Sequence, residues 1–352
     1  MIECRTYEGG AAELARFIQD VWRGSYAGRM PVPLWDERYF DWQLLSERPG
    51  GRDYLLVAYD GTRLVGSLLA EGFRFRLHDR EVDGSMASWM AVDADYRRKG
   101  IGTMLYQEQR RRHVERGAAF SLAFVYLQPG VSLGPVFSSS VAGDTVILGK
   151  VGWWARVLDH RAVVGWDVSR RNRLGVSILR ALHSGPPLAV GLDGIRGYRP
   201  ADLPACLALV HGLLARVDLG CVWSPERLAH QLRYEDVPRT LVVEQDGRVG
   251  GLVNYYRLDL LGRHPIGAGV IDLLAFGSLP NTTRQRLLLA ALAQMREEGM
   301  KFALLLRWPA WPSRPLWATG FVPMPRNLSP ICFVMDRTVS LARVKRLQVH
   351  FR

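Results

Sequence analysis

The chain has 352 residues, of which 48% are hydrophobic and 23% charged, a composition typical of a soluble globular protein long enough for two domains. No segment has the pattern of a signal peptide or the length of a membrane span, and the four cysteines lack metal or disulfide spacing. We therefore expect a cytoplasmic protein without a metal site. The net charge of +12 favours anionic partners such as phosphate groups or an acidic carrier protein.

Nucleic acid is not expected as a partner, although the positive charge would attract it. The only arginine triplet, at residues 110–112, falls inside a predicted helix beside Glu108 and Glu115, and no basic run alternates with aromatic residues as in a nucleic-acid module. We interpret the triplet as a solvated helix face.

The first half alternates strand and helix patterns in chain order. It opens with a strand over residues 2–7 and a helix over 11–22, followed by a hairpin whose turn is Asp60-Gly61. Long paired strands, an amphipathic helix closing at Gly117 and an apolar strand then follow, over residues 67–76, 82–92, 101–117 and 120–126.

The second half repeats the same order. A strand near residue 195 and a helix over 202–216 lead to a second hairpin, with its turn at Asp246-Gly247. Paired strands, a helix closing at Gly299 and an apolar strand follow, over residues 252–259, 269–276, 281–299 and 302–306. Residues 149–153 and 317–321, each with a glycine before an aromatic residue, are placed at equivalent positions of the two halves.

One motif distinguishes the first half. Its strand over residues 86–92 is followed by a basic, glycine-containing run that opens the next helix: Arg97, Arg98, Lys99, Gly100, Ile101, Gly102 and Thr103. Two glycines let backbone N–H groups approach an anion closely, and the helix directs its positive dipole end to the same point. The run therefore predicts a pyrophosphate-binding turn.

This spacing, Arg-x-x-Gly-x-Gly after a strand, resembles the acyl-CoA motif of the GCN5-related N-acetyltransferases. The resemblance implies a mixed α/β fold in two tandem copies, with acetyl-CoA or another acyl-CoA as donor and an amine-bearing small molecule, peptide or protein as acceptor. It also implies that the pantetheine arm bonds to the backbone of Met90, Ala91 and Val92, and that an N–H group there stabilises the oxyanion.

The catalytic groups are less clear in the sequence. The tyrosine that protonates the leaving thiolate in this family falls at Leu148, and the strand over 120–126 carries no carboxylate. Candidates are Glu71 as base, Tyr126 as acid, and Ser88 beside the cleft. The related tandem N-myristoyltransferases use a C-terminal carboxylate as base, which implies Arg352 here if residues 339–352 thread back into the cleft.

The two halves are expected to differ in function. At the position of the glycine turn, residues 277–286 start a helix without the Gly-x-Gly pair. We predict an acyl-CoA-binding domain over 1–165, a bridging helix and linker over 166–193, and a degenerate domain over 194–352 that binds the acceptor or is structural. Residues 307–312, with two tryptophans among prolines, suggest a binding rim.

These patterns favour an N-acyltransferase that moves an acyl group, most simply acetyl, from acyl-CoA to a primary amine. Two alternatives stay open: a fatty-acyl transferase charged by long-chain acyl-CoA or an acyl carrier protein, and a non-catalytic CoA-binding regulatory protein.

Overall fold

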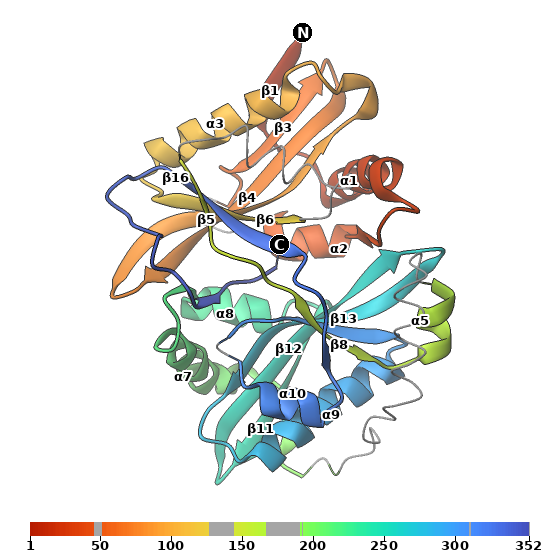
Figure 1. Ribbon diagram of the computed structural model, residues 1–352, viewed down its shortest axis with the longest axis vertical. Coiled ribbons are helices and arrows are strands. Elements are labelled where there is room, and N and C mark those ends of the chain that lie inside the picture. The colour runs from red at the N-terminus through yellow and green to blue at the C-terminus, as the bar shows by residue number, and fades with distance from the viewer. Residues whose placement is uncertain (46–50, 127–143, 167–190, 192, 310, 352) are drawn as a thin grey trace.

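The computed structural model describes residues 1–352 except 46–50, 127–143, 167–190, 192, 310 and 352. Two mixed sheets lie one above the other along the long axis, each covered by helices (Figure 1). The helices are α1 (Ala11–Tyr26), α2 (Glu37–Phe40), α3 (Ile101–Glu115), α5 (His160–Trp166), α7 (Leu203–Leu214), α8 (Pro225–Leu232), α9 (Asn281–Glu297) and α10 (Ser313–Ala318). Short π or 3₁₀ turns cover Asp41–Leu45, Ala94–Tyr96 and Pro200–Asp202. The predicted mixed α/β class with two tandem domains of one fold is confirmed.

The first sheet has the strand order β1-β3-β4-β5-β6-β16-β7, and β10 and β17 extend it beside β4. Its strands are β1 (Ile2–Thr6), β3 (Leu55–Asp60), β4 (Arg63–Leu77), β5 (Arg80–Val92), β6 (Phe120–Tyr126), β7 (Thr145–Ile147), β10 (Leu219–Val222), β16 (Leu328–Val334) and β17 (Leu347–Gln348).

The second sheet has the order β15-β8-β14-β13-β12-β11-β9, with β2 added at the end of β12. Its strands are β2 (Val32–Leu34), β8 (Trp153–Val157), β9 (Ile195–Gly197), β11 (Pro238–Gln245), β12 (Arg248–Leu261), β13 (Pro265–Phe276), β14 (Phe302–Leu306) and β15 (Val322–Pro323).

The local turn predictions are confirmed. Gly61 and Gly247 have φ of 59° and 71° in the two hairpin turns, where a Cβ would be strained. Gly117 and Gly299 follow the ends of α3 and α9 with φ of 69° and 82°, as helix-terminating glycines do.

The two halves exchange strands. β8 from the first half pairs with β14, while β16 from the second half pairs with β6. The exchange is repeated by β2, which pairs with β12, and by β10, which pairs with β4. The division at residues 165 and 194 therefore stays a prediction, because the sheets are assembled across it. Most of the predicted bridging helix lies outside the described residues.

The proposed equivalence of residues 149–153 and 317–321 is wrong. β7 lies beside β16 as β15 lies beside β8, so β7 and β15 are the equivalent strands. Gly320 and Phe321 come directly before β15, whereas residues 149–153 come after β7 and lead into β8. Leu148 therefore does not occupy the position of the family's tyrosine. A Gly-aromatic pair stands at the start of β8 in one half and before β15 in the other. Local sequence cannot show that these two strands are not equivalent.

A pseudo-twofold arrangement joins the halves at the centre. The Trp42 indole N–H donates to the His230 carbonyl at 3.2 Å, and His230 Nε2 lies 2.7 Å from the Trp42 carbonyl. Gln43, the next residue, donates to Gln231 at 3.4 Å. Equivalent residues of the first-half segment 36–45 and of α8 thus contact each other, and a continuous core runs through both halves.

Candidate functional site

A slot opens where β5 and β6 part. The two strands pair in parallel only from Gly84 with Phe120 to Ala87 with Ala123. Beyond that point β5 continues to Val92 without pairing to β6, so its backbone groups on that side are available to a ligand. The predicted donor residues Met90, Ala91 and Val92 line this unpaired stretch.

A β-bulge sits beside the slot. The pairing of β4 with β5 shifts between Ser67 and Leu69, and Trp89 takes φ of 50°. The Ser67 hydroxyl donates to the Trp89 carbonyl at 2.8 Å. The Trp89 ring is 1% exposed and packs edge-to-face on Trp35 and Phe40. A large residue with positive φ on a strand is rare, and this one turns a backbone unit out of the ladder next to the slot.

The glycine turn joins β5 to α3. Arg98 and Gly100 have φ of 61° and 80°, so the chain turns sharply just before the helix begins. Within the described part of the chain, the backbone N–H groups from Arg98 to Thr103 have no acceptor. The first turn of α3 also carries no acidic residue. Free N–H groups at the start of a 15-residue helix form an anion-binding end.

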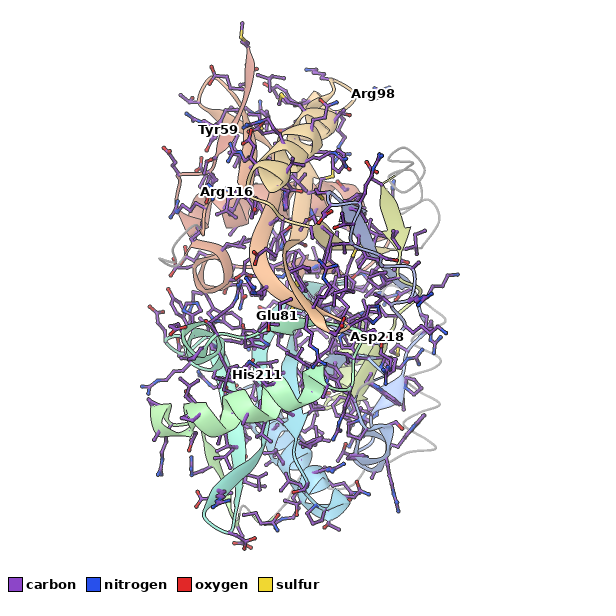
Figure 2. The ribbon with its side chains drawn as sticks, turned by 90° about the vertical axis from the view of Figure 1, so that its left-hand side faces the viewer. Tyr59, Glu81, Arg98, Arg116, His211 and Asp218 are labelled. Atoms are coloured by element: carbon purple, nitrogen blue, oxygen red, sulfur yellow. The ribbon has the colours of Figure 1, made fainter. Side chains whose placement is uncertain are left out.

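The three cations of the glycine turn are not neutralised by nearby carboxylates of the described residues. Arg97 donates to the Ser25 hydroxyl at 2.6 Å, and Lys99 Nζ lies 4.5 Å from the centre of the Tyr96 ring. Arg98 is exposed to solvent just before the N-terminal end of α3 (Figure 2). Among the described residues none of the three forms an ion pair, whereas Arg111 and Arg112 further along α3 are paired with Glu108. The positive charge therefore concentrates at the turn.

The two positions of the turn, 100 and 102, require glycine for different reasons. Gly100 is required because its backbone is left-handed, a conformation that side chains strain. Crowding is not the reason, because a Cβ there would meet nothing within 4 Å. Gly102 has ordinary backbone geometry, but a Cβ would lie 2.8 Å from the Met90 methyl group. Gly102 thus keeps α3 close to the slot strand.

The equivalent turn of the second half is closed. The Arg284 guanidinium donates to the Gly277 carbonyl at 3.2 Å. Leu279 is 4% exposed and would be 2.7 Å from a Cβ at Gly250. Side chains fill the place of the anion-binding turn.

The predicted catalytic residues lie in different surroundings. Glu71 on β4 is 8% exposed and ion-paired with Arg227 of α8, which also donates to the Gly72 carbonyl at 2.7 Å. Ser88 is the first β5 residue beyond the pairing with β6, beside the slot. Tyr126 ends β6, and burial raises its pKa to about 12. Arg352 lies outside the described residues. The roles of all four residues stay predictions.

Sequence reasoning missed three buried residues, of which Trp89 lies beside the slot and the other two lie where β13 and β14 part. Trp89, Asp272 and His350 are each at most 6% exposed, and no local pattern sets them apart from core residues. Trp308 and Trp311 from the suggested binding rim are buried, at 2% and 6% exposed, so that rim is wrong.

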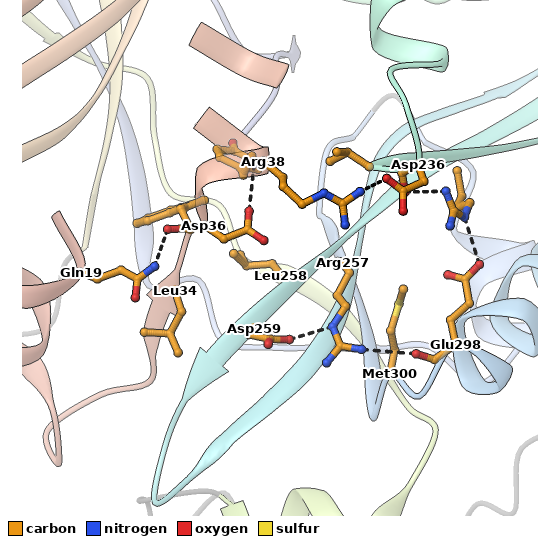
Figure 3. A pocket seen from close by; sticks show the side chains of 14 residues that line it. Gln19, Leu34, Asp36, Arg38, Asp236, Arg257, Leu258, Asp259, Glu298 and Met300 are labelled. Carbon is orange, nitrogen blue, oxygen red and sulfur yellow. Dashed lines mark hydrogen bonds and ion pairs between the residues drawn. The ribbon is translucent and has the colours of Figure 1, made fainter. Parts of the chain in front are cut away.

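A separate cavity of about 410 Å³ lies between α1, β2 and the end of β12 (Figure 3). Its charges compensate each other: Arg38 pairs with Asp236, Arg239 with Glu298, and Arg257 with Asp259. None of its lining residues belongs to the glycine turn, β5 or β6. We assign it no ligand.

The described residues contain neither a metal-binding cluster nor a membrane-spanning helix. No group of three or more His, Cys, Asp or Glu side chains there is arranged to hold a metal ion. No helix in that part of the chain is long and apolar enough to cross a membrane.

Comparisons with known proteins agree with this geometry. Residues 11–130 match the model of the acetyltransferase (GNAT) domain family. N-myristoyltransferase of Saccharomyces cerevisiae with bound myristoyl-CoA superimposes with a TM-score of 0.76 at 16% identity, over 94% of this chain and 82% of that one. A GCN5-related N-acetyltransferase from Kribbella flavida gives 0.54 at 16% identity, over 95% and 72%. No curated protein matches the chain by sequence.

The matched domain, the parted strands and the turn before α3 together identify the GNAT fold in the first half. Residues 11–130 thus match an acetyltransferase (GNAT) domain, and the solved structures share the fold of this chain in two tandem copies.

Proposed function

We propose that the protein transfers a short acyl group, acetyl in the simplest case, from acyl-CoA to a primary amine. The observation that carries the proposal is the row of free N–H groups from Arg98 to Thr103, which follows the slot strand and carries two of the three unpaired cations. The turn supplies charge and backbone donors for the pyrophosphate, and the slot supplies an extended edge for the pantetheine arm.

The reaction follows from this placement. The neutral amine attacks the thioester carbonyl carbon, the C–N bond forms, and the carbonyl oxygen becomes negative. In this proposal a backbone N–H of β5 near the Trp89 bulge stabilises that oxygen. The C–S bond then breaks, and the leaving thiolate takes a proton.

Among the predicted groups, Tyr126 suits the acid. Its phenol is protonated at neutral pH and can give a proton to the thiolate, while burial, which raises its pKa to about 12, makes it a weaker acid than an exposed tyrosine. Glu71 suits the base less well, because its carboxylate is already ion-paired with Arg227 of α8. The amine proton then leaves through solvent, Ser88 or the chain end near Phe351.

A short donor is supported by the packing behind the bulge. Trp89, Tyr39 and Phe40 form a closed aromatic cluster with ring centres 5.5 to 6.0 Å apart. A long acyl chain entering on this side would have to displace rings that are at most 3% exposed. The acceptor is proposed only as an amine, since loops and partner surfaces set acceptor choice in this fold.

A transfer assay tests this proposal. The full chain is incubated with acetyl-CoA and a panel of amines comprising small amines, aminoglycosides, peptides and lysine-containing proteins. Thiol release and product mass are then followed together. We expect acetylated amine in step with thiol release, both lost in Gly102→Trp. Binding of acetyl-CoA with neither thiol release nor product would identify a non-catalytic CoA-binding protein instead. Faster transfer from octanoyl-CoA or an acyl carrier protein would identify the fatty-acyl alternative.

A further inference from the structure

The last described segment of the chain, residues 347–351, enters the centre of the molecule. Leu347 and Gln348 form β17, which pairs with β10 next to the end of β4. All five residues are at most 9% exposed, and the segment ends between the two halves (Figure 1). We call it the tail.

The tail contacts the second half where its own parallel strands part. β13 pairs with β14 only from Ala268 to Ile271, and Asp272 is the next residue and the bulged one opposite β12. His350 Nδ1 lies 3.2 Å from an Asp272 carboxylate oxygen. On the other side the indole N–H of Trp308, just after β14, donates to the Val349 carbonyl at 3.0 Å. The tail thus lies across the second-half counterpart of the slot.

The Asp272 carboxylate is held firmly. Its other oxygen accepts from Gln231 at 2.8 Å, and Gln231 also donates to Asn254 at 3.1 Å. The His350 ring is in turn packed between Phe73 and Trp223, with ring centres 6.4 and 4.8 Å away. A buried carboxylate and imidazole with these neighbours fix the direction of the residue that follows.

That residue, Phe351, reaches the base of the first-half slot. Its ring centre lies 5.5 Å from Phe124 and 4.9 Å from Trp153. Phe124 is the first β6 residue beyond the pairing with β5, so it marks the point where the slot begins. With the pyrophosphate at the glycine turn, this base is the end of the slot at which the acyl group would lie.

We propose that Phe351 is a specificity-determining residue that limits acyl-chain length, and that Asp272 positions it through His350. The inference rests on the proposed acyl-CoA site and goes beyond it, because it makes the second half and the tail part of the donor site. It also explains why the second-half slot takes no donor: the chain itself occupies it.

Calorimetric dissociation constants for CoA, acetyl-CoA, butyryl-CoA and octanoyl-CoA test the inference without any acceptor. For Phe351→Ala we expect the ratio of the octanoyl-CoA to the acetyl-CoA constant to fall at least tenfold, because removing the ring opens space. The constant for CoA, which has no acyl group, should stay within twofold of the wild type. For Asp272→Asn we expect the same direction and at least a threefold change. The matched control is Asp259→Asn, whose carboxylate pairs with Arg257 on β12 away from the tail.

The results separate the possible failures. A merely structural role would weaken all four ligands together, and unchanged ratios in Phe351→Ala would overturn the inference while CoA binding still supports the donor site. A shift in Phe351→Ala without one in Asp272→Asn would overturn the positioning role. If Asp272→Asn does not fold, His350→Gln takes its place with the same expectation. A wild-type chain that binds no CoA would overturn both the inference and the proposed function.

Discussion

His113 is a buried neutral imidazole on α3. It is 0% exposed, its Nε2 lies 2.5 Å from the Ser85 hydroxyl, and its ring stacks on Tyr54 with centres 4.2 Å apart. Burial lowers its pKa to about 4 from an ordinary value of 6.5. Between these values the unfolded chain binds a proton that the folded chain excludes, so His113 makes stability fall as the pH falls from 6.5 to 4. The loss amounts to about 3 kcal/mol.

Chemical denaturation at pH 7 and pH 4.5 of the wild type and His113→Gln measures this effect. Carboxylates contribute to acid destabilisation in both proteins, so the difference between them isolates the imidazole. We expect the variant to be less stable at pH 7, and the gap to narrow at pH 4.5. An equal gap at both values would show that His113 does not titrate on unfolding.

Strand exchange is the main feature at the level of secondary structure. A fragment of residues 1–165 keeps β8 but lacks β14, its partner, and lacks β16, which pairs with β6. It therefore exposes an apolar strand edge and loses core contacts, and we expect it to aggregate. Co-expression with residues 166–352 should restore a soluble complex that unfolds cooperatively on heating. A fragment that unfolds cooperatively alone would contradict the structural role of the exchange.

The elements differ in how far sequence predicts them. Alternating patterns, the Asp-Gly turns and the glycines after α3 and α9 are local signals, and the glycine turn belongs with them. Pairing of β8 with β14 joins residues about 150 positions apart and leaves no local trace. The same limit explains the misplaced equivalence of residues 149–153.

Site residues follow the same rule. Gly100 and Gly102 are visible because their backbone demands are local, whereas Asp272 and His350 gain meaning only when the tail threads between the sheets. Glu71 was visible as a carboxylate near a strand end, but its pairing with Arg227 depends on how α8 packs across the halves.

For the whole molecule, the inequality of the halves is the central result. The first half has a glycine turn with unpaired cations and an unpaired β5 edge, whereas the second has a buried Leu279, an Arg284 that donates to the Gly277 carbonyl, and a slot crossed by the tail. We therefore propose that the same fold has two roles, binding the donor in the first half and completing the site in the second. If the two halves have these different roles, each chain binds one acyl-CoA molecule.

Calorimetric titration of the full chain with acetyl-CoA tests that requirement most directly. We predict a stoichiometry of one, with affinity at least tenfold weaker in Gly102→Trp because the indole obstructs the approach to the turn. Gly212→Trp, at an exposed α7 position with nothing within 4 Å, is the matched control and should bind as the wild type does. Two donors per chain, or unchanged binding in Gly102→Trp, would contradict a single site at the glycine turn.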